Sequence, residues 1–420
     1  MIRLVEKNRL VELLDNKDKR VRNACSNALE KFYPNSEGVI EKLISSINKY
    51  DNECLSLAAI ISRFTPSNND IINLVKLFNS IDPEKNEYSM SIHYHLKSCL
   101  LSFPFEVLEK NHDIINFNEE LSEVYKIVEN RTSIKSQDPD YLWDELYNLC
   151  NNYKDKPIEG NDRQSANLLF EGLCRYPEHI KHKVIMFLNH ETKEKYHFEE
   201  YMVQLAGEFK INETIPFLFR IFLTTDCMHI VNDLCIRSLG KIGSLEVVNE
   251  IGNIYASFDD DQKLSISEIL KYIPYDYSEN FAISLLENEK DKVNKTFLSG
   301  VLCDIFSLKG MSHVLHMIKE KEYDPTIMAL FDYLLPVYIY HKIKIENLSK
   351  IEYNANIFQE NEMKNNSFYK IAAPLHEEFN EYSNKQNISK KLKRNKHKNN
   401  VVPIVGGGSK RRSRRRKKSE

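Results

Sequence analysis

The chain has 420 residues, of which 42% are hydrophobic and 28% are charged, a balance typical of a folded protein with a buried core. It contains only 12 glycines and 13 prolines, which argues against a β-sandwich or β-barrel, because those folds need many turn residues. The net charge of −3 hides an asymmetry: residues 385–420 carry 15 basic residues and one acidic residue, whereas residues 1–384 carry 43 basic and 60 acidic residues.

The N-terminal stretch MIRLVEKNRLVELL has charged and apolar residues at helical spacing, so it predicts an amphipathic helix and not an export signal. The eight cysteines are scattered singly, without a CxxC pair. This pattern indicates reduced thiols packed as small apolar residues in a cytoplasmic protein. In a eukaryotic cell the basic C-terminal residues would also act as a nuclear import signal.

The chain contains internal repeats. Residues 28–43, ALEKFYPNSEGVIEKL, align with residues 60–75, IISRFTPSNNDIINLV, and in each copy a helical pattern ends at an aromatic residue, Phe32 or Phe64, followed by a proline turn. The design recurs in LAGEFKINETIPFL and LGKIGSLEVVNEI, and more weakly in residues 269–286 and 302–318. Helical hairpins repeated at this spacing must stack on their neighbours, so the sequence predicts an α-solenoid.

Two segments, residues 15–32 and 235–252, resemble HEAT-type repeats of the short variety first associated with phycobilisome lyases. The matching residues are Asp18, Val21, Arg22, Ala24, Ala28 and Leu29 in the first copy, and Leu239, Gly240, Ile242 and Gly243 in the second. Glu30 stands where the family often has glycine. The resemblance covers roughly residues 1–105 and 160–320. It implies an all-α, HEAT-like (armadillo-like) solenoid and no particular reaction.

The repeats are interrupted in the middle of the chain and fade after about residue 345. We therefore expect an N-terminal repeat block at 1–135, a second repeat block at 136–345, closing helices at 346–383 and a flexible basic tail at 384–420. The longest apolar segment, residues 327–340, is too short to span a membrane and contains Asp332 and Pro336. It predicts a buried helix, and we expect no insertion into a membrane.

No phosphate loop, dinucleotide-binding glycine motif, nucleophile elbow or HExxH motif is present, so we expect neither catalysis nor a cofactor. The segment CRYPEHIKHKVIMFLNH contains Cys174, His179, His182 and His190, but their spacing fits no familiar zinc pattern. We interpret them as surface histidines beside a core cysteine, and expect no metal site.

Some HEAT-like proteins are DNA glycosylases, which grip DNA in a basic groove. The single tryptophan, Trp143, instead stands among Asp138, Asp140, Asp144 and Glu145, and such an acidic setting repels phosphate. An enzyme such as a lyase or a glycosylase is therefore our third hypothesis.

The tail contains two basic runs, KKLKRNKHK (390–398) and KRRSRRRKK (410–418). The candidate residues for binding a nucleic acid or another polyanion are Lys390, Lys391, Lys393, Arg394, Lys410, Arg411, Arg412, Arg414, Arg415, Arg416, Lys417 and Lys418. No aromatic residue is interleaved with them, so any nucleic-acid binding should be independent of base sequence. The alternatives are a tail that aids solubility and a tail that folds back on the acidic body.

The C-terminal residues PIVGGGSKRR resemble a SEC-C zinc motif, through Pro403, Gly406, Gly408 and Lys410. The family's cysteines are missing, and no cysteine follows Cys303. The resemblance therefore implies a motif that has lost its metal.

The leading functional hypothesis is a non-catalytic scaffold or adaptor whose concave face binds a protein partner, with the basic tail as an electrostatic tether. The acidic body suits a partner with a basic patch. The alternative hypothesis is an RNA- or DNA-associated protein that uses the tail for sequence-independent phosphate binding.

Overall fold

The structure is a computed structural model that describes residues 2–50, 54–103, 105–116, 121, 131, 134, 137–153, 156–190, 196–225 and 229–365. Every regular element in these residues is a helix, and a single β-bridge pairs Arg3 with Tyr275. The predicted all-α class is confirmed. Residues Met1–Gln359 form one compact unit, which includes both predicted repeat blocks. In the part of the chain that is described, no helix is long and apolar enough to cross a membrane.

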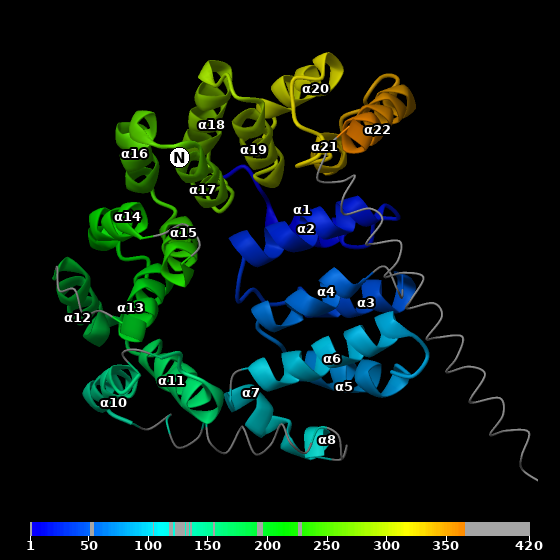
Figure 1. Cartoon of the computed structure of the whole chain (residues 1–420). Coiled ribbons are helices and arrows are strands. Elements are labelled where there is room, and N and C mark those ends of the chain that lie inside the picture. The colour runs from blue at the N-terminus through cyan, green and yellow to red at the C-terminus, as the bar shows by residue number, and fades with distance from the viewer. Residues whose placement is uncertain are drawn as a thin grey trace, which may run out of the picture. The chain divides into compact units, whose positions relative to one another are not determined.

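Eight helices contact one another in succession and form what we call the central row (Figure 1). Its members, in spatial order, are α13 (Tyr196–Glu208), α15 (Ile230–Ile242), α17 (Asp260–Leu270), α19 (Lys292–Asp304), α21 (Leu330–Tyr340), α2 (Lys19–Phe32), α4 (Leu55–Ile60) and α6 (Glu87–Ser102). The spatial order departs from the chain order at one point, where α2 packs against α21. The N-terminal hairpin, formed by α1 (Lys7–Leu13) and α2, thereby continues the row that the later helices begin.

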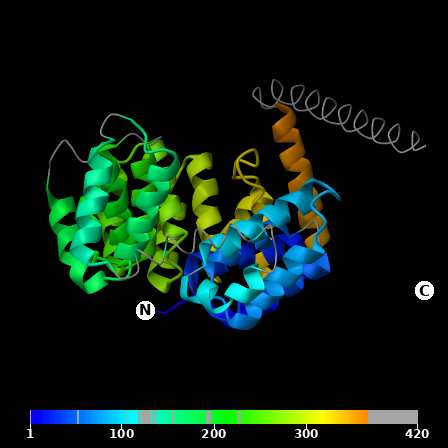
Figure 2. The ribbon, with the colours of Figure 1, turned by 90° about the horizontal axis from the view of Figure 1, so that it is seen from below.

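The remaining helices lie beside this row. A second layer contains α12 (Pro177–Asn189), α14 (Ile215–Thr224), α16 (Leu245–Ile254) and α18 (Asp276–Asn288), which contact one another in order. In Figure 2 the green helices of both layers stand side by side. The other helices are α1 (Lys7–Leu13), α3 (Ile40–Tyr50), α5 (Asn68–Ser80), α7 (Phe105–Lys110), α8 (His112–Asn116), α10 (Pro139–Asn151), α11 (Gly160–Leu173), α20 (Gly310–Glu320) and α22 (Leu348–Asn365), with the short 3₁₀ helices η2 (Ile61–Arg63), η4 (Asn212–Thr214) and η5 (Tyr255–Ser257).

The helix ends follow local sequence signals. Helix α2 begins after Asp18, whose side chain accepts a hydrogen bond from the backbone N–H of Arg20, and it ends at Phe32 as predicted. Helix α5 begins with a capping box between Ser67 and Asp70. Helix α15 ends at Ile242 and is capped by Gly243, whose φ of 57° is the left-handed conformation that glycine tolerates best. These local signals set where successive helices of the chain begin and end.

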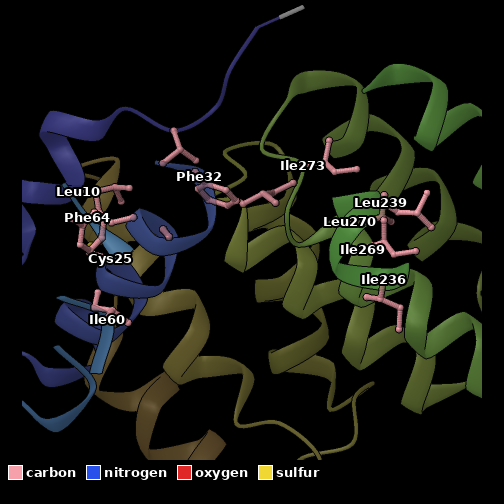
Figure 3. Packing of buried hydrophobic residues seen from close by; sticks show 14 of the residues in the cluster. Leu10, Cys25, Phe32, Ile60, Phe64, Ile236, Leu239, Ile269, Leu270 and Ile273 are labelled. Atoms are coloured by element: carbon pink, nitrogen blue, oxygen red, sulfur yellow. The ribbon is translucent and has the colours of Figure 1, made fainter. Parts of the chain in front are cut away.

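The core consists of aliphatic, aromatic and cysteine side chains contributed by successive helices. Figure 3 shows Leu10, Cys25 and Phe64 gathered around α2, and Ile269 and Leu270 on α17. Of the described cysteines, all are free, and all except Cys174 are buried. They pack as small apolar residues, as the sequence predicted, while Cys227 lies outside the described residues.

The apolar segment 327–340 contains α21, and Pro336 lies within this helix. Leu334, Val337 and most of their neighbours are buried. Their burial follows from the position of α21 between α19 and α2. The prediction of a buried helix is therefore confirmed.

The N-terminus differs from the prediction of a helix from the first residues. Helix α1 begins only at Lys7, and the preceding segment pairs with the turn before α18. The backbone N–H of Leu4 donates to the carbonyl of Pro274 at 2.9 Å, and the N–H of Asp276 donates to the carbonyl of Ile2 at 3.0 Å. In an extended conformation, the backbone N–H and C=O groups of residues 2–4 can form these hydrogen bonds with the turn before α18. The prediction of a helix was therefore wrong for this segment.

Candidate partner-binding surface

Basic side chains attach the N-terminal hairpin to α21 and to α22. The guanidinium of Arg9 donates from Nε to the carbonyl of Tyr340 at 3.2 Å, and from Nη2 to the carbonyl of Ile339 at 3.0 Å. These carbonyls belong to the last turn of α21, where a helix leaves its acceptors unsatisfied and carries partial negative charge. A cation from α1 therefore caps α21.

Arg20 joins α2 to two later helices. Its Nη1 lies 2.8 Å from Asp332 Oδ1 on α21 and 2.7 Å from Glu352 Oε1 on α22, while its Nη2 lies 2.8 Å from Asp18 Oδ2. Hydrogen bonds to Asp18 first, and then to the other two carboxylates, raise the pKa of Arg20. In return, Arg20 lowers the pKa of Asp18. One guanidinium thus holds three carboxylates from three segments of the chain.

Next to this attachment, five polar and aromatic residues form what we call the junction cluster: Lys31, Glu268, Tyr272, Asp304 and Tyr333. Lys31 on α2 places its Nζ 3.3 Å from Asp304 Oδ2 on α19. The same Nζ lies 5.4 Å from the centroid of the Tyr272 ring, close enough for a cation–π interaction. The cluster therefore joins the N-terminal hairpin to α17, α19 and α21.

The groups of the junction cluster influence one another electrostatically. Burial opposes the charged form of Lys31, but Asp304, Tyr272 and Glu268 outweigh it, so the pKa of Lys31 is raised. Burial and the charge of Asp304 raise the pKa of Tyr333. Lys31 is therefore a cation, and Tyr333 a neutral phenol, at ordinary pH.

The Tyr272 ring fits against α15 because α15 has a glycine, Gly240, at the point of contact. A Cβ atom on Gly240 of α15 would lie 2.7 Å from the Tyr272 Cβ. The ring packs in the space that this glycine leaves, between α15 and α2. Gly240 thus positions an aromatic residue of the junction cluster.

The junction cluster presents binding groups to solvent. Tyr333 is 41% exposed, and the Glu268 side chain, which pairs with Lys271 at 2.6 Å, is 46% exposed. Tyrosine offers a large apolar ring and a hydroxyl that donates and accepts hydrogen bonds, and it is enriched among the residues that dominate protein interfaces. The adjacent Cys303 is buried, and burial raises the pKa of its thiol. The surface is suited to recognising another molecule through aromatic and polar contacts.

The residues predicted from the sequence to bind polyanions, in 390–394 and 410–418, lie outside the described residues. The predicted closing segment 346–383 is described as far as residue 365, where it contains α22. The predicted boundaries between repeat blocks remain predictions.

The histidines and the cysteine considered for metal binding do not form a cluster of three ligands among the described residues. Cys174 lies against the core, and burial raises its pKa to about 12. His179 points its Nε2 to Asp140 Oδ1 at 2.8 Å. Within the described ranges, no group of three His, Cys, Asp or Glu residues is arranged to hold a metal ion.

A pocket of about 280 Å³ lies between α18, α19 and α20 and is lined by His313, His316 and Glu287, among others. Its charged groups pair within the pocket: Lys295 Nζ lies 3.4 Å from Glu322 Oε2, and His313 Nε2 lies 4.0 Å from Glu287 Oε1. The pocket holds one lysine, two glutamates and two histidines, and this set of groups indicates no particular ligand.

Sequence reasoning missed the junction cluster. Its members are separated by up to 302 positions, and no repeat pattern indicates which helix follows α21 in space. One signal was present: the first 50 residues carry ten basic and seven acidic residues, in contrast to the acidic remainder of the body. That local excess supplies Arg9, Arg20 and Lys31.

Comparison with known proteins adds no family to these observations. No protein-family model matches the chain, and no curated protein sequence matches it.

Proposed function

We propose that the chain is a non-catalytic scaffold or adaptor with a HEAT-like α-solenoid fold, which binds a protein partner through the exposed side of the central row. The observation that carries this proposal is the continuity of the row across α21 and α2, which gives one extended surface from helices at both ends of the chain. Extended surfaces of this kind, on the concave side, are what helical solenoids use for binding.

The junction cluster is the proposed centre of that surface. Tyr333 is exposed and Tyr272 is held in place by Gly240, while the surrounding charges are already paired with one another. A rigid aromatic residue among satisfied polar groups costs little to desolvate, which is the arrangement expected of an interface hot spot. The single, buried cysteines fit a reducing compartment such as the cytoplasm.

The test is quantitative co-purification of the tagged full-length chain from its source cells, with variants. Tyr333→Ser should lower the yield of a stoichiometric partner about tenfold, because a hot-spot residue contributes a factor of that size. The matched control is Tyr353→Ser, which removes an exposed tyrosine on α22, outside the row. Equal partner yields from wild type and Tyr333→Ser would contradict the proposal, as would turnover of a small-molecule substrate by the purified chain.

The second candidate function, binding of RNA or DNA, is favoured by the tail's two basic runs, with six and eight charges. Lysines and arginines at this density release counterions from a polyanion and bind it without reading its sequence. In our proposal this activity serves as a tether, and the row selects the partner. Loss of the partner on deletion of residues 385–420, with the row intact, would favour the second function.

A further inference from the structure

Helix α10 carries an acidic and an aromatic residue three positions apart, twice in succession. Asp140 and Trp143 form the first pair, and Asp144 and Tyr147 form the second pair one helical turn later. Residues at this spacing are neighbours on a helix surface. The two pairs therefore offer the same chemical combination at adjacent turns.

The first pair holds a lysine of the chain itself. Lys183 on α12 places its Nζ 2.6 Å from Asp140 Oδ1 and 5.3 Å from the centroid of the Trp143 ring. A carboxylate neutralises the ammonium charge, and the negative face of the indole attracts it. Lys183 and then His179 lower the pKa of Asp140. This acid–aromatic pair is thus seen to bind a lysine side chain.

Among the described residues, no lysine pairs with the second pair in this way. One turn beyond Lys183, α12 carries Phe187, whose ring centroid lies 5.0 Å from that of Phe198. Tyr147 also packs edge-on against Phe198, at 5.2 Å, which fixes its ring while leaving the residue 46% exposed. In the described parts of the chain, Asp144 has no ion-pair partner. The second pair is preformed and open to solvent.

Two further residues of α10 extend this site. Tyr141 is 49% exposed and lies three positions before Asp144, so tyrosines flank the carboxylate on both sides. Glu145 is exposed, without an ion-pair partner among the described residues, and lies four positions after Tyr141. The segment 138–145 contains four carboxylates and no basic residue. Its charge repels phosphate and attracts cations.

We propose that Asp144 and Tyr147, together with Tyr141 and Glu145, bind a lysine or arginine side chain of a protein partner. The carboxylate of Asp144 pairs with the cationic group, and a tyrosine ring stacks against it, as Asp140 and Trp143 do for Lys183. This site lies on α10, outside the central row, and so adds a second contact of defined chemistry to the proposed adaptor. The site on α10 is tested with a lysine peptide, and the row is tested by partner co-purification with the Tyr333 variant. A negative result for one therefore leaves the other standing.

The test uses Trp143 as a reporter, because it is the only tryptophan of the chain. The full-length protein is titrated with an acetylated and amidated octapeptide of alternating lysine and serine, and tryptophan emission is followed. We expect a saturable change that weakens with salt, and no change with the peptide in which glutamate replaces lysine. Asp144→Asn should weaken binding about fivefold, and Tyr141→Ser about threefold.

Two variants control for charge and ring. Glu320→Gln removes one exposed carboxylate at the end of α20 and should leave the affinity within about twofold. Tyr353→Ser removes an exposed tyrosine ring on α22, outside the site, and should also leave the affinity unchanged. Equal affinities of wild type and Asp144→Asn, at unchanged unfolding midpoints, would overturn the proposal. A gain in peptide affinity on deletion of residues 385–420 that disappears when Asp144→Asn is added would also overturn it, because it would assign the site to the chain's own tail.

Discussion

At the scale of single residues, glycines set how closely the helices of the central row approach. A Cβ atom on Gly207 of α13 would lie 2.7 Å from the Cα of Ser238 on α15, a distance at which the backbone itself must move. Gly252 on α16 is different, because its nearest neighbour would be a ring carbon of Phe281 at 3.6 Å, an ordinary contact. The same substitution should therefore have opposite effects at the two positions.

We expect Gly207→Ala to lower the free energy of unfolding by about 2 kcal/mol, because overpacking against backbone outweighs alanine's better helix propensity. Gly252→Ala should be neutral or stabilising by up to about 1 kcal/mol. Urea denaturation followed by circular dichroism measures both values. A loss of similar size at both glycines would show that close packing of α13 on α15 is not the cause.

Asp18 should make the free energy of unfolding depend on pH. Arg20 lowers the pKa of this carboxyl in the folded state, so Asp18 contributes stability that is fully present above its unfolded pKa of about 4. This contribution is lost as the pH falls through the lower, folded value. Unfolding measured between pH 5 and pH 2 should therefore show a shallower pH dependence for Asp18→Asn than for wild type. Identical slopes would mean that the Asp18–Arg20 pair adds nothing.

At the scale of elements, the N-terminal hairpin is held by polar contacts to helices more than 300 residues away. Arg9 caps α21, and Arg20 binds Asp332 and Glu352. These contacts surround apolar packing of α2 on α21. The hairpin should consequently protect α21 from solvent.

Arg20→Gln leaves Asp332 and Glu352 without their shared partner, so we expect a loss of about 1–2 kcal/mol in unfolding free energy. Amide hydrogen exchange in α21 should accelerate. Arg63→Gln is the matched control, because Arg63 is largely exposed and its pairing with Glu30, at 3.2 Å, contributes little. Faster exchange in α21 in both variants alike would contradict a specific role for Arg20.

The elements differ in how far the sequence predicted them. The ends of α2 and α5, at Phe32 and Ser67, were predictable because the signals are local: an aromatic residue, a proline turn and a cap. The packing of α2 on α21 was not predictable from the sequence. Every repeat carries a similar apolar pattern, and this pattern does not specify which helix will be its neighbour in space. The extended start of the chain escaped prediction for a related reason, since its pairing partner, Pro274, is remote in sequence.

At the scale of the whole molecule, charge separates the body from the tail. The body, residues 1–384, has a net charge of −17, and the tail a net charge of +14. An acidic body does not bind a polyanion by itself, so nucleic-acid affinity should reside in the tail. The candidate binding residues of the tail are predicted from composition alone and lie outside the described residues, whereas the junction cluster required the fold.

Deletion of residues 385–420 should abolish gel-shift binding of a random RNA or DNA duplex at 50 mM salt. For the intact chain, raising salt to 200 mM should weaken binding by about 10³-fold, as expected for six or more phosphate contacts. The sequence of the duplex should make no difference, since no aromatic residue accompanies the basic runs. Binding that survives the deletion would place the affinity in the body.

Hydrogen exchange of the full chain, with and without its captured partner, tests whether the row formed across α21 and α2 is the partner-binding surface. We predict slower exchange on partner binding at the junction cluster, in the peptides that contain Lys31, Tyr272 and Tyr333. Protection confined to residues 384–420, with unchanged exchange in α2, α17, α19 and α21, would contradict it.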